Sequence, residues 1–149
     1  MDALRQIGVI ARALDSISNI EFREVDLTRG QYLYLVRIVE TPGIIQAQLG
    51  DQLKVDRATV ARSVAKLCRQ GLVEKHPDPH NAKRQRLYAT AAGQKAYDPI
   101  RRENAYSLAM ATKHLTTEQI ATLTQLLATM VENVDHDWQF VKNGGKRQY

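Results

Sequence analysis

Apolar residues recur at steps of three and four over most of the chain, which is the spacing of amphipathic helices. The first stripe predicts an N-terminal helix and consists of Leu4, Ile7, Ala11, Leu14 and Ile17. A second helix is predicted over the apolar run that starts at Gln31 and ends before Pro42 and Gly43. Thr28 or Asp26 is expected to cap it.

Two shorter helices separated by a tight turn come next. The first is predicted over residues 46–53, and the turn falls on Lys54 and Val55. Asp56 is placed to cap a helix over residues 57–70, and Gly71 stands where a left-handed C-terminal cap belongs. This part of the chain therefore has the order helix, turn, helix.

The apolar period then changes from helical to extended. Residues 72–76 and 84–89 form two short extended segments. Between them lie residues 77–83, where Pro77 and Pro79 exclude a helix because they restrict their own backbone and that of the preceding residue. The pattern predicts a β-hairpin with a long tip.

The C-terminal part returns to helical spacing. Thr90 is placed to cap a long helix toward Ala111, which Pro99 is expected to kink or to break in two. Thr116 and Gln119 fit a capping box that opens a last helix. The apolar stripe of this helix consists of Ile120, Leu123, Leu127, Met130, Val134 and Trp138. Residues 143–149 have no apolar period and are expected to be frayed.

The composition supports one globular domain over residues 1–149. The 44% apolar and 25% charged residues are ordinary for such a domain, and no apolar run approaches the ~20 residues of a membrane span. The N-terminus lacks the layout of a secretory signal. Cys68 is the single cysteine, which excludes an internal disulfide and fits a reducing compartment. We therefore expect a cytoplasmic protein with no membrane contact.

The positive charge is concentrated in one segment. Between Asp56 and Arg86 there are eight basic and three acidic residues, a balance of +5 that equals the formal charge of the whole chain. The basic residues are Arg57, Arg62, Lys66, Arg69, Lys75, Lys83, Arg84 and Arg86. Such a segment is typical of a surface that binds a polyanion, although charge alone equally fits a solvated lysine-rich face.

The helix predicted over residues 57–70 has two different faces. Val60, Val64 and Leu67 form an apolar stripe that can anchor the helix to a core. The opposite side carries donors of the kind that read bases and phosphates in a DNA major groove. The candidate contacts of this recognition helix are Arg57, Ala58, Thr59, Arg62, Ser63 and Lys66. For Arg57, both a bidentate contact to guanine and a phosphate contact remain open.

The hairpin is a candidate second DNA-binding arm. Its contact residues are expected to be His80, Lys83, Arg84 and Arg86. A basic wing of this kind lies along the DNA backbone or inserts an arginine into the minor groove. The alternative is that the charges merely protect the edge of a small sheet from aggregation.

Three runs of the sequence together resemble the MarR family of bacterial and archaeal regulators. Residues 40–60, ETPGIIQAQLGDQLKVDRATV, are similar to its helix-turn-helix. Residues 67–75, LCRQGLVEK, resemble the end of its recognition helix and the first wing strand. Residues 78–93, DPHNAKRQRLYATAAG, resemble its wing and the start of the next helix. With the flanking helices, the resemblance covers nearly the whole chain.

The sequence departs from the family pattern at four positions. Lys54 stands where the family often has glycine, and Ile45 replaces a hydroxyl residue that helps to start the helix. In the wing, Asn81 and Lys83 stand where aspartate and arginine are usual. The loss of this charge pair shifts the expected minor-groove contact from Lys83 toward Arg84 or Arg86.

The resemblance implies a mainly α winged helix-turn-helix fold with N- and C-terminal dimerisation helices. Residues 28–90 would form the DNA-binding part, and residues 1–25 and 91–141 the dimerisation part. The implied function is a homodimeric transcriptional regulator, usually a repressor, on a roughly palindromic operator of double-stranded DNA. The terminal apolar stripes also fit an intramolecular core. A winged-helix module that binds another protein, without operator binding, is the alternative function.

The family resemblance also implies a small aromatic or phenolic effector. Phe22, Tyr32, Tyr34 and Arg37 are the candidate pocket residues, although tyrosines on a core-facing helix are more often packing.

Other chemistry has little support. Cys68 follows Leu67 on the core side of the recognition helix, where a thiol is usually inert, so a redox role is the weaker interpretation. Residues 135–137, Asp-His-Asp, would diverge on a helix and form a poor metal site. No catalytic arrangement is apparent, and we expect no enzyme activity, metal or cofactor.

Overall fold

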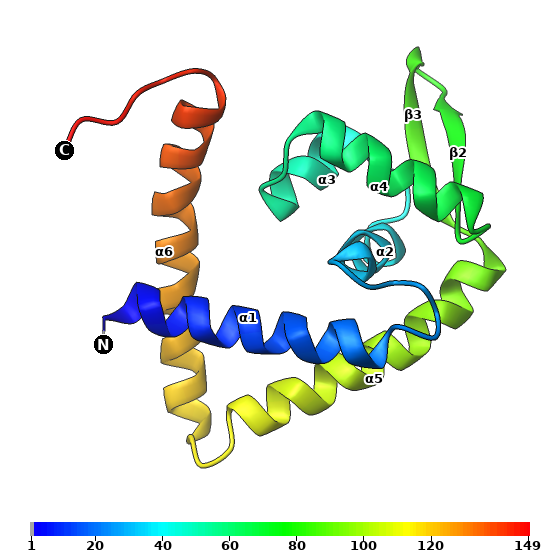
Figure 1. The fold of residues 1–149 in the computed structure, drawn as a ribbon. Helices are drawn as coiled ribbons and strands as arrows, with labels where there is room; N and C mark the ends of the chain where they lie inside the picture. Colours follow the sequence, from blue (N-terminus) through cyan, green and yellow to red (C-terminus); the bar gives the residue numbers. More distant parts are fainter. Residues whose placement is uncertain (1) are drawn as a thin grey trace. The chain divides into compact units, whose positions relative to one another are not determined.

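The computed structural model describes residues 2–149 and has mainly helical secondary structure with one small antiparallel sheet (Figure 1). The predicted mainly α fold with a β-hairpin wing is confirmed. The chain divides into two compact units, one ending at Ser107 and one starting at Leu108. The elements are α1 (Ala3–Glu21), α2 (Gln31–Glu40), β1 (Ile44–Ile45), α3 (Gln46–Leu53), α4 (Arg57–Arg69), β2 (Val73–Asp78), β3 (Asn81–Ala89), α5 (Ala91–Ala111) and α6 (Thr117–Lys142).

The sheet has the strand order β1-β3-β2, and both pairs are antiparallel. The predicted long tip is wrong, because β2 and β3 continue until only Pro79 and His80 separate them. β2 is an edge strand and therefore tolerates Pro77, which has no N–H to donate. The Asp78 carboxylate closes the tip by accepting a hydrogen bond from the His80 N–H at 2.8 Å.

Strand β1 was not predicted from the sequence. It contains only Ile44 and Ile45, which pair with Leu87 and Arg86 of β3. A strand of two residues has no period that a pattern can reveal. It nevertheless joins the start of α3 to the wing, so the helix-turn-helix and the hairpin form one body.

The buried apolar side chains among the described residues lie between Phe22 and Ile100. Helix α2 packs against α3, α4 and β3 within this core (Figure 1). The predicted anchor stripe of α4 is confirmed, since Val60, Val64 and Leu67 are 1%, 0% and 0% exposed. Their burial holds one face of α4 against the core and leaves the other face to solvent.

Most of the predicted helix boundaries are confirmed. The Asp56 carboxylate accepts from the Thr59 N–H at 2.9 Å, and the Thr90 hydroxyl accepts from the Gly93 N–H at 3.0 Å. Thr116 and Gln119 form the expected capping box. Gly71 follows α4 with a φ of +73°. Local sequence signals therefore define where these helices begin and end.

The cap predicted for the second helix is wrong. Gly30, with a φ of +74°, precedes α2 and supplies no side chain. Asp26 is instead directed to α4, where its carboxylate contacts Lys66. The Asp26 side chain thus forms a long-range ion pair instead of the predicted helix cap.

Of the kink or break expected at Pro99, the break is wrong, because α5 is continuous from Ala91 to Ala111, and the kink stays a prediction. Proline removes one backbone hydrogen bond from a helix interior. The neighbouring Ile100 is fully buried, and this anchor favours continuation of the helix.

Lys54 ends α3 in the left-handed conformation, with φ +56° and ψ +48°. A residue with a Cβ atom pays about 1–2 kcal/mol there relative to its right-handed conformation. The turn between α3 and α4 therefore adopts the left-handed conformation without a glycine.

Helices α1 and α6 both present apolar side chains to solvent. On α1, Leu4 and Ile20 are 65% and 68% exposed, and on α6, Val131 and Val134 are 59% and 58% exposed. No residue of α6, which the structure describes throughout, is buried. None of the helices in the described part of the chain combines the length and hydrophobicity that a bilayer span requires.

Candidate nucleic-acid interface

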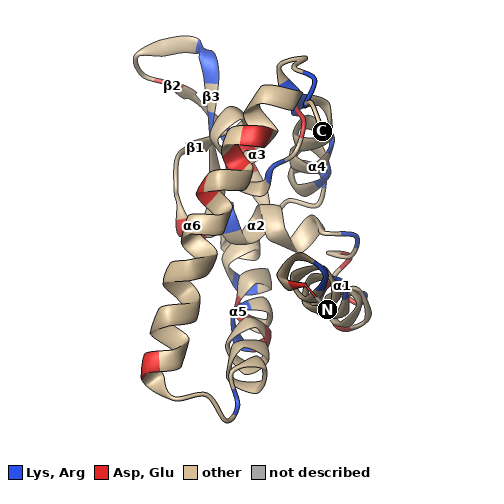
Figure 2. Ribbon diagram, turned by 90° about the vertical axis from the view of Figure 1, so that its left-hand side faces the viewer, with Lys and Arg blue, Asp and Glu red and all other residues tan. Residues whose placement is uncertain are grey.

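The solvent-facing side of α4 carries the predicted recognition residues. Arg57, Ala58 and Arg62 are exposed, whereas Thr59, Ser63 and Lys66 are half-buried. Figure 2 shows basic segments on α4 and on β3 of the neighbouring wing. The structure thus presents both predicted arms as basic surfaces of the same compact unit.

The first turn of α4 is ordered by hydrogen bonds between side chains. The two carboxylate oxygens of Asp56 accept from the Thr59 N–H at 2.9 Å and from the Thr59 hydroxyl at 2.7 Å. The same hydroxyl accepts from Arg62 Nη2 at 3.1 Å. The bonds from Thr59 hold the pKa of Asp56 below its ordinary value, so this carboxylate is ionised at neutral pH.

Three contacts attach the segment before α2, together with the first residue of α2, to α4. Lys66 Nζ lies 3.1 Å from an Asp26 carboxylate oxygen, and Gln70 Nε2 donates to the Asp26 carbonyl at 3.0 Å. The buried Gln31 side chain donates to the Ser63 carbonyl at 2.6 Å. Ser63 and Lys66 therefore also help to hold α4 in place, a role that their sequence position did not reveal.

In the wing, Arg86 differs from its basic neighbours. Its Nη2 lies 2.9 Å from the Asp78 carboxylate, and its Nη1 donates to the Gly43 carbonyl at 3.0 Å. The Asp78 side chain is only 2% exposed. His80, Lys83 and Arg84 are exposed. Arg86 thus ties the end of β2 to the segment before β1, and the exposed residues form the outer surface of the wing.

A groove separates the wing from the start of the helix-turn-helix. Its lining residues are Ile45, Gln46, Ala47, Arg57, Asn81, Lys83, Arg84 and Gln85. It brings Arg57 of α4 together with Lys83 and Arg84 of β3. Gln46 and Ala47, at the N-terminus of α3, were not among the predicted site residues, because no charge or motif distinguishes them in the sequence.

Comparison with known proteins agrees with this arrangement. The sequence model of the MarR family matches residues 25–84. The HTH-type transcriptional regulator YybA of Bacillus subtilis is 53% identical over 148 residues, which are 99% of each chain. A crystal structure of a putative MarR family transcriptional regulator from Listeria monocytogenes, complexed with 26mer DNA, is 51% identical. That structure has a TM-score of 0.96 and covers 100% of this chain and 99% of its own.

This chain belongs to the MarR family of transcriptional regulators. A SlyA-like transcription regulator from Listeria monocytogenes is also 51% identical, with a TM-score of 0.92 and coverage of 100% of this chain and 99% of its own. The resemblance found in the three sequence runs is thereby confirmed over the full length.

In this MarR regulator the predicted effector residues are mostly core residues. Phe22, Tyr32 and Tyr34 are 3%, 7% and 6% exposed. The rings of Phe22 and Tyr32 pack with their centroids 5.2 Å apart. Arg37 forms an ion pair with Glu40 at 3.6 Å. The structure brings the first two aromatic rings together as packing, and the effector pocket stays a prediction.

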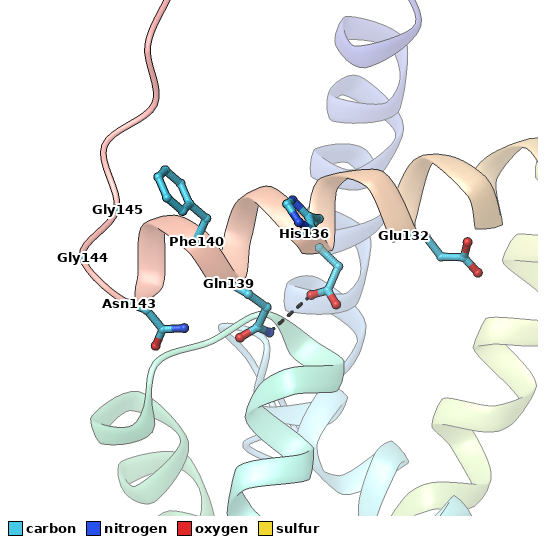
Figure 3. Close-up of a pocket in the computed structure, with 8 residues that line it drawn as sticks. Glu132, His136, Gln139, Phe140, Asn143, Gly144 and Gly145 are labelled. Carbon is cyan, nitrogen blue, oxygen red and sulfur yellow. Dashed lines mark hydrogen bonds between the residues drawn. The ribbon is translucent and has the colours of Figure 1, made fainter.

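The MarR regulator's single thiol, that of Cys68, is half-buried and packs against the core. Of the predicted diverging triplet, Asp135 and His136 line a hollow at the end of α6, where Gln139 donates to Asp135 at 3.5 Å (Figure 3). Asp137 instead pairs with Arg147 at 3.3 Å. Residues 2–149 contain no group of three potential metal ligands.

The buried Asp78 should make the wing of this MarR regulator sensitive to acid. The His80 N–H bond is the main reason that the pKa of Asp78 lies below its ordinary value, with Arg86 contributing and burial opposing. A carboxylate with a lowered pKa stabilises the fold above its unfolded pKa and loses this contribution as pH falls through the folded value. Thermal midpoints measured between about pH 3 and pH 7 should therefore fall below about pH 4, and less steeply in Asp78→Asn.

The matched control for this titration is Glu24→Gln, which removes an exposed carboxylate that lies outside the wing. The thermal midpoint of this variant should fall with decreasing pH as steeply as that of the wild type. Identical acid limbs for Asp78→Asn and the wild type would show that the Asp78 carboxylate does not carry the effect.

Proposed function

We propose that this MarR regulator is a homodimeric repressor that binds a roughly palindromic operator in double-stranded DNA. The observation that carries the proposal is the basic face of α4 beside the basic wing, with Arg57, Lys83 and Arg84 around one groove. The Listeria relative complexed with 26mer DNA supports it, because that chain shares 51% of its residues and the same fold.

Some of the proposed DNA contacts contribute to sequence specificity and others to affinity. Arg57 and Arg62 are exposed on α4, and each can form bidentate contacts to guanine or clamp a phosphate. Ala58 and Thr59 lie in the same first turn, where short side chains let the helix approach the bases. Lys83, Arg84 and His80 extend the interface along the backbone or into the minor groove. Arg86 supports the wing and is not proposed as the inserted arginine, since Asp78 and Gly43 occupy it.

Exposed apolar surface supports the homodimer. The α1 residues Leu4, Ile10 and Ile20 are 65%, 55% and 68% exposed, and Leu123 and Val134 of the α6 stripe are 43% and 58% exposed. Apolar surface of this extent on terminal helices favours association with a second copy. Two-fold symmetry would then place two α4 helices about one DNA turn apart.

Repression and release by a small aromatic or phenolic effector complete the proposal. Repression needs no further activity, because a dimer that occupies a promoter blocks transcription. Release by an effector is proposed from the family resemblance. A winged-helix module that binds another protein remains the alternative, and the basic character of α4 and the wing argues against it.

The proposal is tested by selecting duplexes from a random-sequence library with the purified chain. Enrichment of an inverted repeat is the expected result. Arg57, Arg62, Lys66, Lys83 and Arg84 supply roughly ten cations per dimer, so affinity for the selected duplex should fall at least ~10³-fold between about 50 and 200 mM salt. No enrichment and a salt-independent affinity would instead support the protein-binding module.

A further inference from the structure

Three side chains at the start of α4 are connected in series by hydrogen bonds. The Thr59 hydroxyl lies 2.7 Å from an Asp56 carboxylate oxygen, and Arg62 Nη2 lies 3.1 Å from the same hydroxyl. Thr59 is half-buried, and Asp56 and Arg62 are exposed. This relay stands on the face proposed to enter the major groove.

The direction of each bond follows from the chemistry of the groups. An ionised carboxylate only accepts and a guanidinium only donates, so the Thr59 hydroxyl must give its proton to Asp56 and accept from Arg62. The hydroxyl therefore has no proton left for a DNA acceptor while the relay is formed. In this arrangement the Thr59 hydroxyl orients the side chains of Asp56 and Arg62.

The two arginines of the recognition face consequently differ. The Arg62 guanidinium is turned toward the N-terminal end of α4 by its bond to Thr59, three residues earlier. Among residues 2–149, no side-chain hydrogen bond or ion pair holds the Arg57 guanidinium in this way. Arg62 thus meets DNA already ordered, whereas Arg57 must be ordered on binding.

We propose that Thr59 is a positioning residue that contributes to sequence specificity. Asp56 orients its hydroxyl, and this hydroxyl holds the Arg62 guanidinium in the orientation that contacts the operator. The proposal rests on the proposed DNA-binding function of α4. Ordering one long side chain on binding corresponds to about 2- to 12-fold in affinity per half-site. For a dimer on two half-sites, the loss of the relay corresponds to about 5- to 150-fold.

The test is Thr59→Val, measured on a duplex selected by the wild-type protein and on a scrambled duplex of equal length. Valine removes the hydroxyl but keeps the shape of the side chain and the Thr59 N–H, which Asp56 still caps. Thermal unfolding should be nearly unchanged. Binding to the selected duplex should weaken by about 5- to 150-fold, and binding to the scrambled duplex should not.

Thr59→Ser is the matched control, because serine keeps the hydroxyl and loses only the methyl group. It should retain most of the wild-type preference for the selected duplex. A loss as large as that of Thr59→Val would overturn the relay, since the methyl group would then be the important part.

A double-mutant cycle with Arg62→Ala separates positioning from direct contact. If Thr59 acts through Arg62, Thr59→Val causes no further loss in an Arg62→Ala background. Additive losses, or equal losses on both duplexes, would overturn the relay and leave the proposed DNA-binding function standing. Failure of the wild-type protein to prefer any duplex would overturn both.

Discussion

Replacing Arg57 and Arg62 together with alanine should reduce operator binding to the level of non-specific binding. The double variant removes four guanidinium groups from a dimer, and a good bidentate contact contributes about 1–3 kcal/mol of discrimination. A loss of at least ~10³-fold on the selected duplex is therefore expected. Titration of a labelled duplex at fixed salt, read by fluorescence anisotropy, measures it. The fold should survive, because both side chains are exposed.

Arg101→Ala with Arg102→Ala provides the charge-matched control. These exposed arginines lie on α5, and their removal lowers the net charge by the same amount. Only a modest, salt-dependent weakening is expected. If the α4 variant still preferred the selected duplex over a scrambled one by the wild-type ratio, α4 would not be the reading helix.

The helix boundaries around the site were predictable because their causes are local. Asp56, Thr90 and Thr116 cap helices through hydrogen bonds to residues only three positions away. The buried stripe of α4 likewise follows from spacing within one helix. These features therefore follow from local sequence signals and require no knowledge of tertiary contacts.

The features that were missed depend on partners distant in the sequence. Asp26 was expected to cap a helix and instead pairs with Lys66, 40 residues away. The bond from the Arg86 guanidinium to the Gly43 carbonyl, 43 residues earlier, was also not predicted, while the DNA contact of Arg86 stays a prediction. Strand β1 exists only because β3 pairs with it. Spacing cannot reveal such contacts, since each is decided by which surfaces the fold brings together.

The wing shows how a departure from the family pattern is compensated. Asn81 and Lys83 stand in the wing in place of an acid and an arginine, so the usual charge pair is absent. In the structure Asn81 accepts from the Lys83 N–H at 3.1 Å, while Asp78 pairs with Arg86. A turn bond at Asn81 and the buried Asp78 carboxylate therefore both order the tip of the wing. Both leave Lys83 and Arg84 exposed for the proposed DNA contacts.

Introducing a charge into the α6 stripe with Leu127→Asp should dissociate the proposed dimer. Leu127 belongs to the apolar stripe of α6, a helix with no buried residue, and it is 36% exposed. In a symmetric interface both copies carry the change, so the lost apolar contact of about 1.5–3 kcal/mol counts twice. The dimer dissociation constant should rise by at least ~10²-fold, and more if the two carboxylates meet. Sedimentation velocity across a concentration series measures it.

Gln125→Asp is the control, because this exposed residue lies on the opposite side of the same helix turn and the substitution introduces the same charge. It should leave the dissociation constant unchanged. Monomeric Leu127→Asp should also lose most of its affinity for an inverted repeat, since one α4 reads only one half-site. It should retain the helical circular dichroism of the wild type, because Leu127 is not part of the buried core. A folded Leu127→Asp dimer with wild-type affinity for the repeat would exclude the α6 stripe as the interface.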